Sequence, residues 1–288
     1  MTPEIDPIAS ESREHHSLTL NAIHDLLTQS SEPFINLEIE TLAIRREAMD
    51  LAETPPHFFT KYTGPFLSLD PFPAEDDWPF PRLNDSPSWN ASALAWHLNS
   101  WLKSCVWPGR DAQDDKMSYG AFDFDDLSER SSKPHWAVIS VWPMRDSDLP
   151  HLVALMYTGI DITASPECLL RSEVLVVIQI MRSRLPNQTT RLHSTSPVLL
   201  YSVVGMHHVR VIEGFHDAKQ IVIRVTKLYD ISKPDEELYF ELRSWQYGSA
   251  SEKSTNDSKV TPEGDRIADS IEETSVRGEL DETKQEHP

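Results

Sequence analysis

The feature that most limits how this chain can fold is a proline-rich segment that runs from Thr54 to Asn90. It holds eight prolines, together with phenylalanines and tryptophans spread along its length. Proline lacks a backbone N–H donor, so this density excludes a regular helix or a central strand. Disordered linkers, in contrast, are poor in aromatic residues. We therefore expect an extended segment that its rings hold across a domain; a peptide motif that a partner protein recognises is the alternative.

Charge and composition divide the rest of the chain into three parts. The 288 residues carry a net charge of -20, yet residues 133–247 hold 12 acidic and 12 basic residues. Residues 1–16 lack an apolar run, and residues 248–288 lack aromatic residues and are rich in Ser, Glu, Asp and Lys. Such compositions are typical of disorder. We therefore expect a single domain over residues 17–247, between a disordered N-terminus (1–16) and a disordered acidic tail (248–288).

The same composition limits the compartment and the partners. No apolar run approaches the length that spans a bilayer, and the N-terminus lacks the apolar core of a secretory signal. We therefore expect a soluble protein of the cytoplasm or the nucleus, with no membrane contact. Its two cysteines predict no disulfide framework. The strong negative charge would repel a phosphate backbone, which argues against general nucleic-acid binding.

Apolar periodicity predicts a domain of mixed helices and strands. Ser17 can cap the first helix, and Ser165-Pro166-Glu167 is a typical start for the last one. Residues 148–162 are ambiguous between helix and strand. We expect an α+β fold in which N-terminal helices and the Pro/aromatic segment surround a buried helix packed on a small antiparallel sheet. The expected helices cover residues 18–29, 36–53, 91–107 and 165–185, and the expected strands cover 135–142, 197–205, 207–215 and 220–230.

Asp217-Ala218-Lys219 lies between the last two predicted strands and has the acid-x-lysine spacing of restriction-endonuclease-like nucleases. We expect Phe215 to pair with Ile221 and Glu213 with Ile223, because this register separates an apolar face from a mixed one. The tripeptide then lies at the hairpin tip. A nuclease needs these side chains on a strand, beside a second acid, to hold Mg²⁺ and activate water. A degenerate restriction-endonuclease-like fold is therefore the third functional hypothesis, after the two described below.

Four charged side chains are the candidate catalytic residues. Glu213 would lie on the apolar face of the hairpin, where a carboxylate needs a charged or hydrogen-bonding partner. Glu173 lies in the predicted buried helix, and Arg224 and Lys227 lie in the last strand. Convergence of these groups on an open cleft would support an enzyme. Burial in closed ion pairs would make them structural.

The remaining motifs do not define a catalytic or cofactor site. The segment FDFDDLSE (residues 122–129) resembles acidic motifs of terpene cyclases but fails EF-hand spacing, and we interpret it as solvated surface. The pairs His15-His16 and His207-His208 lack the spacing of a zinc site. No glycine-rich nucleotide loop occurs, so we expect no cofactor and no metal ion. Cys105, on the apolar stripe of helix 91–107, is expected to be an inert buried thiol.

Part of the neutral segment resembles an orphan family of filamentous-fungal proteins. The family pattern is a helix, a small-residue strand that ends in glycine, and a strand pair whose second member ends in Leu-Tyr-Asp. Here these features are Gly205, the turn from Phe215 to Lys219, and Leu228-Tyr229-Asp230. The family often has Asp-Gly where this chain has Asp217-Ala218, which supports a hairpin turn. The resemblance covers roughly residues 133–231 and implies an origin and a fold, with no activity or site residue.

These features favour a non-enzymatic interaction or accessory protein with a protein partner. The grounds are the missing catalytic motifs, the acidic tail and the Pro/aromatic segment. Orphan proteins of this kind sometimes accompany secondary-metabolite gene clusters. The alternative is therefore an accessory or enzymatic protein of a fungal secondary-metabolite pathway, which would bind a small apolar ligand between the Trp-rich helix 91–107 and the sheet.

Overall fold

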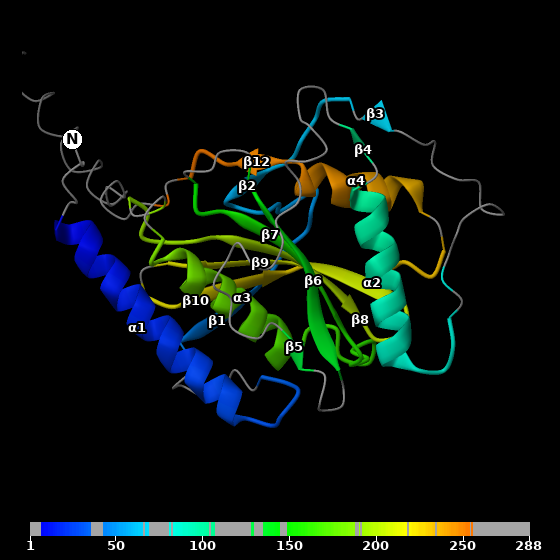
Figure 1. Ribbon diagram of the computed structural model, residues 1–288, viewed down its shortest axis with the longest axis horizontal. Helices are drawn as coiled ribbons and strands as arrows, with labels where there is room; N and C mark the ends of the chain where they lie inside the picture. The colour runs from blue at the N-terminus through cyan, green and yellow to red at the C-terminus, as the bar shows by residue number, and fades with distance from the viewer. Residues whose placement is uncertain are drawn as a thin grey trace, which may run out of the picture.

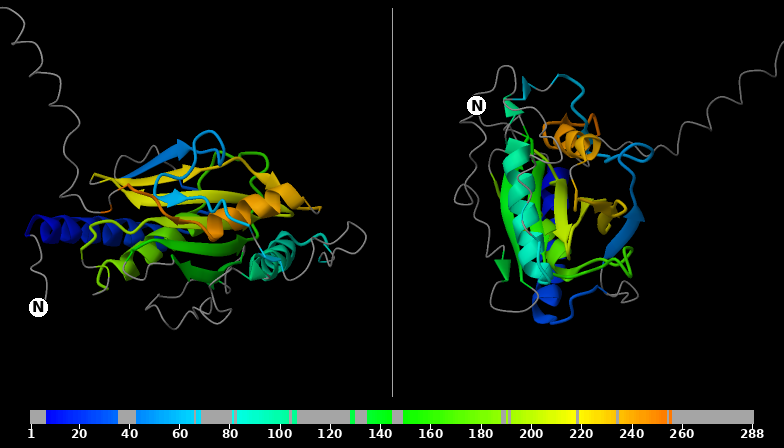
Figure 2. Two further views of the ribbon diagram at one scale, coloured as in Figure 1. Left: turned by 90° about the horizontal axis from the view of Figure 1, so that it is seen from above. Right: turned by 90° about the vertical axis from the view of Figure 1, so that its right-hand side faces the viewer.

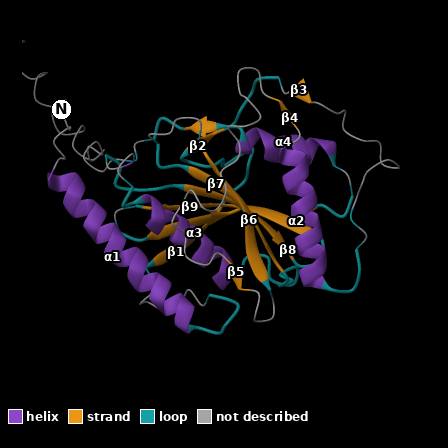
Figure 3. Ribbon diagram, in the orientation of Figure 1, coloured by secondary structure: helices purple, strands orange, loops and turns teal. Residues whose placement is uncertain are grey.

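A central sheet with helices on both faces forms the core of the molecule, as the computed structural model shows (Figures 1 and 3). The described residues are 7–35, 43–65, 67–68, 81, 83–103, 105–106, 128–129, 135–144, 149–187, 190, 192–217, 219–233, 235–253 and 255. Their helices are α1 (Pro7–Gln29), α2 (Pro87–Lys103), α3 (Arg171–Arg184) and α4 (Glu236–Gln246). Their strands are β1 (Ile44–Ala48), β2 (Phe59–Thr60), β3 (Leu67–Ser68), β4 (Cys105–Val106), β5 (Ser128–Glu129), β6 (Trp136–Pro143), β7 (Leu152–Thr158), β8 (Val198–Val204), β9 (His208–His216), β10 (Ile221–Val225), β11 (Tyr229–Asp230) and β12 (Ser249–Ala250).

The main sheet has eight strands in the order β1-β10-β9-β8-β7-β6-β5, with β11 paired to β9. β8, β9 and β10 form the antiparallel meander that the sequence predicted. β7 and β8 are parallel, and so are β1 and β10. The α+β class is therefore confirmed. The expected small antiparallel sheet is a larger mixed one, because β7 and β1 add parallel pairs on either side of the meander.

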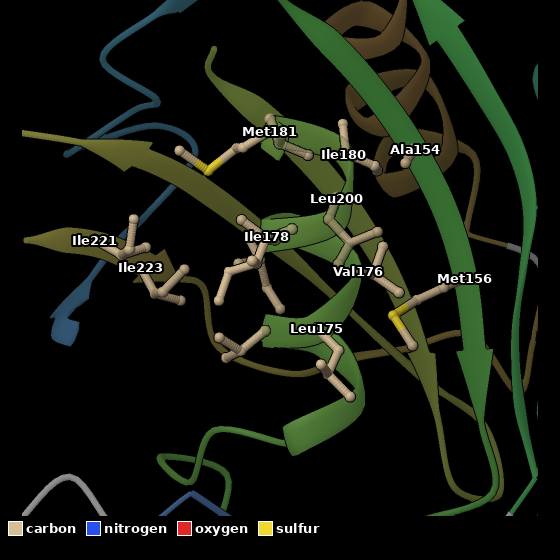
Figure 4. Close-up of a cluster of buried hydrophobic side chains, with 14 of the residues drawn as sticks. Ala154, Met156, Leu175, Val176, Ile178, Ile180, Met181, Leu200, Ile221 and Ile223 are labelled. Atoms are coloured by element: carbon tan, nitrogen blue, oxygen red, sulfur yellow. The ribbon is translucent and has the colours of Figure 1, made fainter. Parts of the chain in front are cut away.

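One face of the sheet is covered by α3 and α1. Parallel strands need a long connection, and α3 supplies it between β7 and β8. Almost every side chain of α3 is buried, as expected for a helix with the sheet on one side and α1 on the other. Figure 4 shows Val176, Ile178 and Ile180 of α3 among apolar side chains from β7, β8 and β10.

The opposite face is covered by α2 and α4 (Figure 2). Leu94 and Leu98 of α2 and Leu242 of α4 are fully buried against it. Phe58 and Phe59 join the same core. These two rings hold residues 54–60 of the Pro/aromatic segment across the domain, as the sequence predicted, and β2 pairs with β12. The end of the segment differs from the expectation, because residues 87–90 form the first turn of α2, where proline is tolerated, and Trp89 is exposed.

Coverage on both faces explains the sequence of the central strands. Every residue of β8 and of β10 is buried. A strand enclosed in this way needs no alternation of polar and apolar residues, and its sequence is a nearly continuous apolar run.

Among the described helices, none has both the length and the apolar character that a membrane span requires.

The predicted helix over residues 36–53 was wrong, since its described part contains β1, which pairs in parallel with β10. Arg45, Arg46 and Glu47 are acceptable in a helix by propensity. The buried strand β10, however, needs a neighbour to satisfy the backbone groups along its second edge. Tertiary pairing therefore overrides local preference in this segment.

Other element bounds also differ from the expectation. α1 begins at Pro7 rather than at Ser17, so the residues from Pro7 to His16 are helical and not disordered. α2 ends at Lys103, and Cys105 lies in β4 instead of on a helix. Residues 249–250, expected in the disordered tail, form β12. Residues 1–6 and 256–288 lie outside the described part of the chain.

The start of α3 and the whole of α4 also escaped prediction. α3 begins at Arg171, because the residues before it are held in other ways: Leu170 forms a β-bridge with Phe34, and the carbonyls of Pro166 and Cys168 accept hydrogen bonds from Arg210, each at 2.9 Å. α4 follows a conventional cap: Asp235 accepts a hydrogen bond from the N–H of Leu238 at 3.0 Å. Two glutamates in its first turn add to that signal.

Gly214 in β9 permits the close approach of α3, and we predict that Gly214→Ala destabilises the protein. A Cβ at this position would lie 2.3 Å from Cγ1 of Val177. Because the buried helix would have to move, we expect a loss of about 1–3 kcal/mol in the free energy of unfolding, measured with urea. Gly64→Ala is the control, since the three atoms nearest to its Cβ would all belong to the ring and hydroxyl of Tyr62, which can rotate away. Equal losses in both variants would contradict this prediction.

His151 predicts a loss of stability in acid. Burial, and then the charges of His193 and Arg184, lower its pKa to about 3. An unfolded histidine has a pKa of about 6.5, so between these values the unfolded chain binds one more proton and stability falls as the pH falls. In His151→Leu, the slope of unfolding free energy against pH between about pH 4 and 6 should be shallower by up to about 1.4 kcal/mol per pH unit. Urea titrations at several pH values measure the slope, and an unchanged slope would refute the assignment.

Candidate functional site

Asp217 and Lys219 lie in the turn between β9 and β10, as predicted, and not in a strand. Oδ1 of Asp217 accepts hydrogen bonds from the N–H groups of Lys219 at 3.1 Å and Gln220 at 3.0 Å. The N–H of Asp217 donates to the carbonyl of Gln220 at 3.1 Å, and Oδ2 pairs with Arg45 of β1 at 3.0 Å. Asp217 is thus a turn-forming residue tied to the neighbouring strand.

The register of this hairpin differs from the predicted one. Glu213 lies opposite Arg224, and Phe215 lies opposite Val222 rather than Ile221. The prediction assumed that one face of the hairpin is buried, but helices and loops bury both. Separation of apolar from polar residues therefore cannot select the register, and the hydrogen bonds of the Asp217 turn select it.

Glu213 forms a closed ion pair with Arg224. Oε2 of the carboxylate lies 2.8 Å from Nη1 of the guanidinium, and Oε1 accepts a hydrogen bond from the N–H of Phe58 at 2.7 Å. Arg224 also donates to the carbonyls of Pro55 at 2.8 Å and Thr54 at 3.0 Å. The pair therefore fixes the Pro/aromatic segment to the sheet.

Glu173 forms a second closed pair, with Arg210. Nε of Arg210 donates to Oε1 at 2.9 Å, and Nη2 bonds to Oε2. Oε2 also accepts a hydrogen bond from the N–H of Leu170 at 3.2 Å. With its two bonds to the carbonyls of Pro166 and Cys168, Arg210 fixes the loop before α3 to the sheet.

The candidate catalytic residues do not converge. Arg210 faces α3, whereas Glu213 lies on the opposite face of β9 with Arg224, and the carboxylates of both pairs are at most 1% exposed. Lys227 belongs to neither pair; its Nζ lies 5.6 Å from the ring centroid of Tyr229. Paired and hydrogen-bonded on all sides, Glu173 and Glu213 act as structural groups.

Lys227 borders a cavity of about 610 Å³ between α4 and the loops beside it. Carboxylates outnumber amines in its lining, and one lysine there, Lys61, is paired with Glu241. In the described residues no group of three or more His, Cys, Asp or Glu side chains is placed to hold a metal ion. The lining residues are Asp50, Leu51, Ala52, Lys61, Lys227, Leu228, Tyr229, Asp230, Asp235, Glu237, Leu238 and Glu241.

A second cavity, of about 470 Å³, lies between α1 and α3, and we call it the α1–α3 cavity. Polar side chains from both helices face each other across it. The residues that line it are Arg13, Glu14, Ser17, Asn21, Gln179, Arg182, Ser183, Leu185 and Pro186.

The tryptophans of α2 do not line a pocket between this helix and the sheet. Trp101 packs under the guanidinium of Arg243, with 3.2 Å between the guanidinium carbon and the ring centroid. Trp89 and Trp96 point outward and are 47% and 56% exposed. We call the side of α2 that carries these two residues the outer face of α2.

The other motifs give no further site among the described residues. Residues 122–127 of the FDFDDLSE segment lie outside that part of the chain, and its last two residues form β5. The rings of His207 and His208 stand 4.4 Å apart. The ring of His16 stacks on His216 at 3.7 Å, and both are buried.

Comparisons with protein-family models, with curated proteins and with solved structures found no match for this chain. The resemblance to an orphan fungal family therefore stays a prediction. Inferences about function rest on the geometry of the chain itself.

Sequence reasoning missed the residues that define these surfaces. Arg210 was correctly placed in a strand, but its burial was not predicted, because the loop before α3 that covers it is far away in sequence. The outward direction of Trp96 was available in principle, because it falls opposite the Leu94–Leu98 stripe on a helical wheel. The α1–α3 cavity had no sequence signal, since it forms between residues far apart in the chain.

We predict that Glu213→Gln lowers the free energy of unfolding by about 3 kcal/mol, because it leaves the buried Arg224 with only the more distant carboxylate of Glu47, 3.6 Å from its Nε. In a double-mutant cycle of wild type, Glu213→Leu, Arg224→Met and the double variant Glu213→Leu/Arg224→Met, the double variant should lose less than the sum of the two single losses. Urea denaturation of all four proteins measures this cycle. Lys61→Met breaks the partly exposed pair with Glu241 and is the control, with an expected loss of at most about 1 kcal/mol. Additive losses in the cycle would refute the pairing.

Proposed function

We propose that this protein is a non-enzymatic interaction protein that binds its partner through the outer face of α2. The observation that carries this proposal is the exposure of Trp89 and Trp96, about half of each side chain. Their positions differ by seven, so they lie two turns apart on one side of the helix. Tryptophan is strongly enriched among the residues that dominate binding energy at protein interfaces.

The partner is a protein surface with an apolar centre and a basic rim. Ser92 and Ala93 lie between the two tryptophans, and their small side chains leave room for a partner side chain between the rings. The net charge of -20 attracts basic surfaces over a distance and repels acidic ones. Asp85, exposed just before α2, adds negative charge at one end of the face.

The two alternatives raised by the sequence have less support. A small apolar ligand between α2 and the sheet would need space that Leu94, Leu98 and Leu102 fill with fully buried side chains. A nuclease would need free carboxylates, whereas Glu173 and Glu213 are tied into ion pairs. An accessory protein that works by contact requires neither a pocket nor a reactive group.

We predict that the double variant Trp89→Ala/Trp96→Ala loses its partner. Tagged wild-type and variant chains are captured in parallel from cells, the differing proteins are purified, and their dissociation constants are measured. We expect the Kd to rise by at least about tenfold in the variant, because each ring supplies binding energy at the centre of the interface. Binding to the wild-type protein should weaken with added salt.

Leu18→Ala/Leu26→Ala is the matched control, since it removes two exposed apolar side chains from α1. It should leave partner binding unchanged. A partner that binds the tryptophan variant as tightly as the wild type would overturn the proposal.

Two other occupants of the face would also overturn it. If the purified wild-type protein sediments as a dimer and the tryptophan variant as a monomer, the face binds a second copy of the chain. Acrylamide should quench the part of the tryptophan fluorescence that the wild type has and the variant lacks. If it does not, other parts of the chain cover the face.

A further inference from the structure

The α1–α3 cavity interrupts an otherwise apolar helix–helix contact. α1 buries Leu20, Ile23 and Leu27 in the core of this side of the sheet. Next to this stripe, Ser17 and Asn21 of α1 turn to the cavity together with Gln179 of α3. Polar side chains on both helices thus line a hollow of about 470 Å³ that is open to solvent on one side.

The two ends of the cavity are held by arginines. Nε of Arg182 donates to Oδ1 of Asn21 at 2.7 Å, which joins the helices at one end. Arg13 donates to the carbonyl of Leu185, just past the end of α3. Arg13 also donates to the carbonyl of Thr190 at 3.5 Å, so both guanidiniums have fixed positions on the wall.

The lining has a positive balance in a strongly negative protein. Arg13 and Arg182 contribute two guanidiniums, and Glu14 contributes one carboxylate. Burial lowers the pKa of Arg13, which means that desolvation disfavours its charged form and that an anion beside it would restore the balance. The net charge of -20 repels polyanions from the surface around the cavity, so a small anion is the better fit.

Gln179 adds a requirement for a hydrogen-bond donor. Its side chain is 8% exposed, and its Oε1 accepts no hydrogen bond within the described structure. A buried acceptor without a donor is unfavourable. A ligand that brings an N–H group to this wall would satisfy the amide, and the carboxylate of Glu14 would favour a positively charged donor.

We propose that the α1–α3 cavity binds a small zwitterionic carboxylate with the charge pattern of an acidic amino acid. Two ligand carboxylates lie toward Arg13 and Arg182, and the ligand ammonium lies toward Gln179 and Glu14. The volume is within the range of small-molecule sites. This site is on the α1 and α3 side of the sheet and is independent of the outer face of α2.

The test measures binding of three probes by titration calorimetry and thermal shift. L-glutamate carries both charge types, glutarate has the same two carboxylates without the ammonium, and inorganic phosphate is an anion without either. We expect saturable binding of one L-glutamate per chain, with glutarate at least about tenfold weaker, since it lacks a charge-assisted hydrogen bond. Phosphate should bind more weakly than L-glutamate.

Two variants assign the binding to the cavity. Gln179→Met should reduce the preference for L-glutamate over glutarate to less than about threefold, and Arg13→Gln should weaken both ligands by at least about tenfold. Gln29→Met, at the exposed end of α1, is the control and should change nothing. If Arg13→Gln fails to fold because it loses its bond to Leu185, the preference measured with Gln179→Met still decides.

Three results would overturn this proposal. One is the absence of saturable L-glutamate binding up to about 10 mM, a limit that already corresponds to very weak affinity. Another is phosphate binding as tight as that of L-glutamate, which would make the site a general anion site. The last is a Gln179→Met variant that prefers L-glutamate over glutarate as strongly as the wild type does.

Discussion

Two buried arginine–glutamate pairs, one on each face of β9, hold the parts of this fold together. Arg210 with Glu173 fastens the loop before α3, and Arg224 with Glu213 fastens the Pro/aromatic segment. Burial of a charge is costly unless a partner and further hydrogen bonds satisfy it. Each guanidinium therefore needs both its carboxylate and the carbonyls of the loop it holds. Irregular segments acquire in this way a fixed place on the sheet that their own sequence does not specify.

The same arrangement separates two surfaces of different character. The sheet is enclosed by α1 and α3 on one face and by α2 and α4 on the other. The charged groups at its centre are bound to each other in ion pairs. Both proposed binding surfaces therefore lie at the periphery. On one side this is the polar α1–α3 cavity, and on the other it is the outer face of α2, where Trp89 and Trp96 meet solvent.

Much of the fold was predictable because local signals and burial agree. The strands β6, β8 and β9, the buried character of α3, and the turn at Asp217 follow from β-branched runs, from a helix that is apolar nearly all round, and from turn chemistry. The candidate site was predictable only in part. Glu213 was correctly singled out as a carboxylate in apolar surroundings, yet its partner was not found, because a shift of one residue in the register decides that Arg224 lies opposite it.

The sequence by itself determined the class of the fold, the apolar strands of the meander and the absence of any known catalytic motif, since these depend on residue type and on spacing along the chain. Tertiary structure alone decided that residues 44–48 form a strand, that Glu173 pairs with Arg210, and that α1 and α3 line a polar cavity. The physical reason is distance along the chain. Each of these features joins segments that are far apart in sequence. Its stability depends on contacts with the distant segment, and hydrophobic periodicity and helix or strand propensity report only on nearby residues.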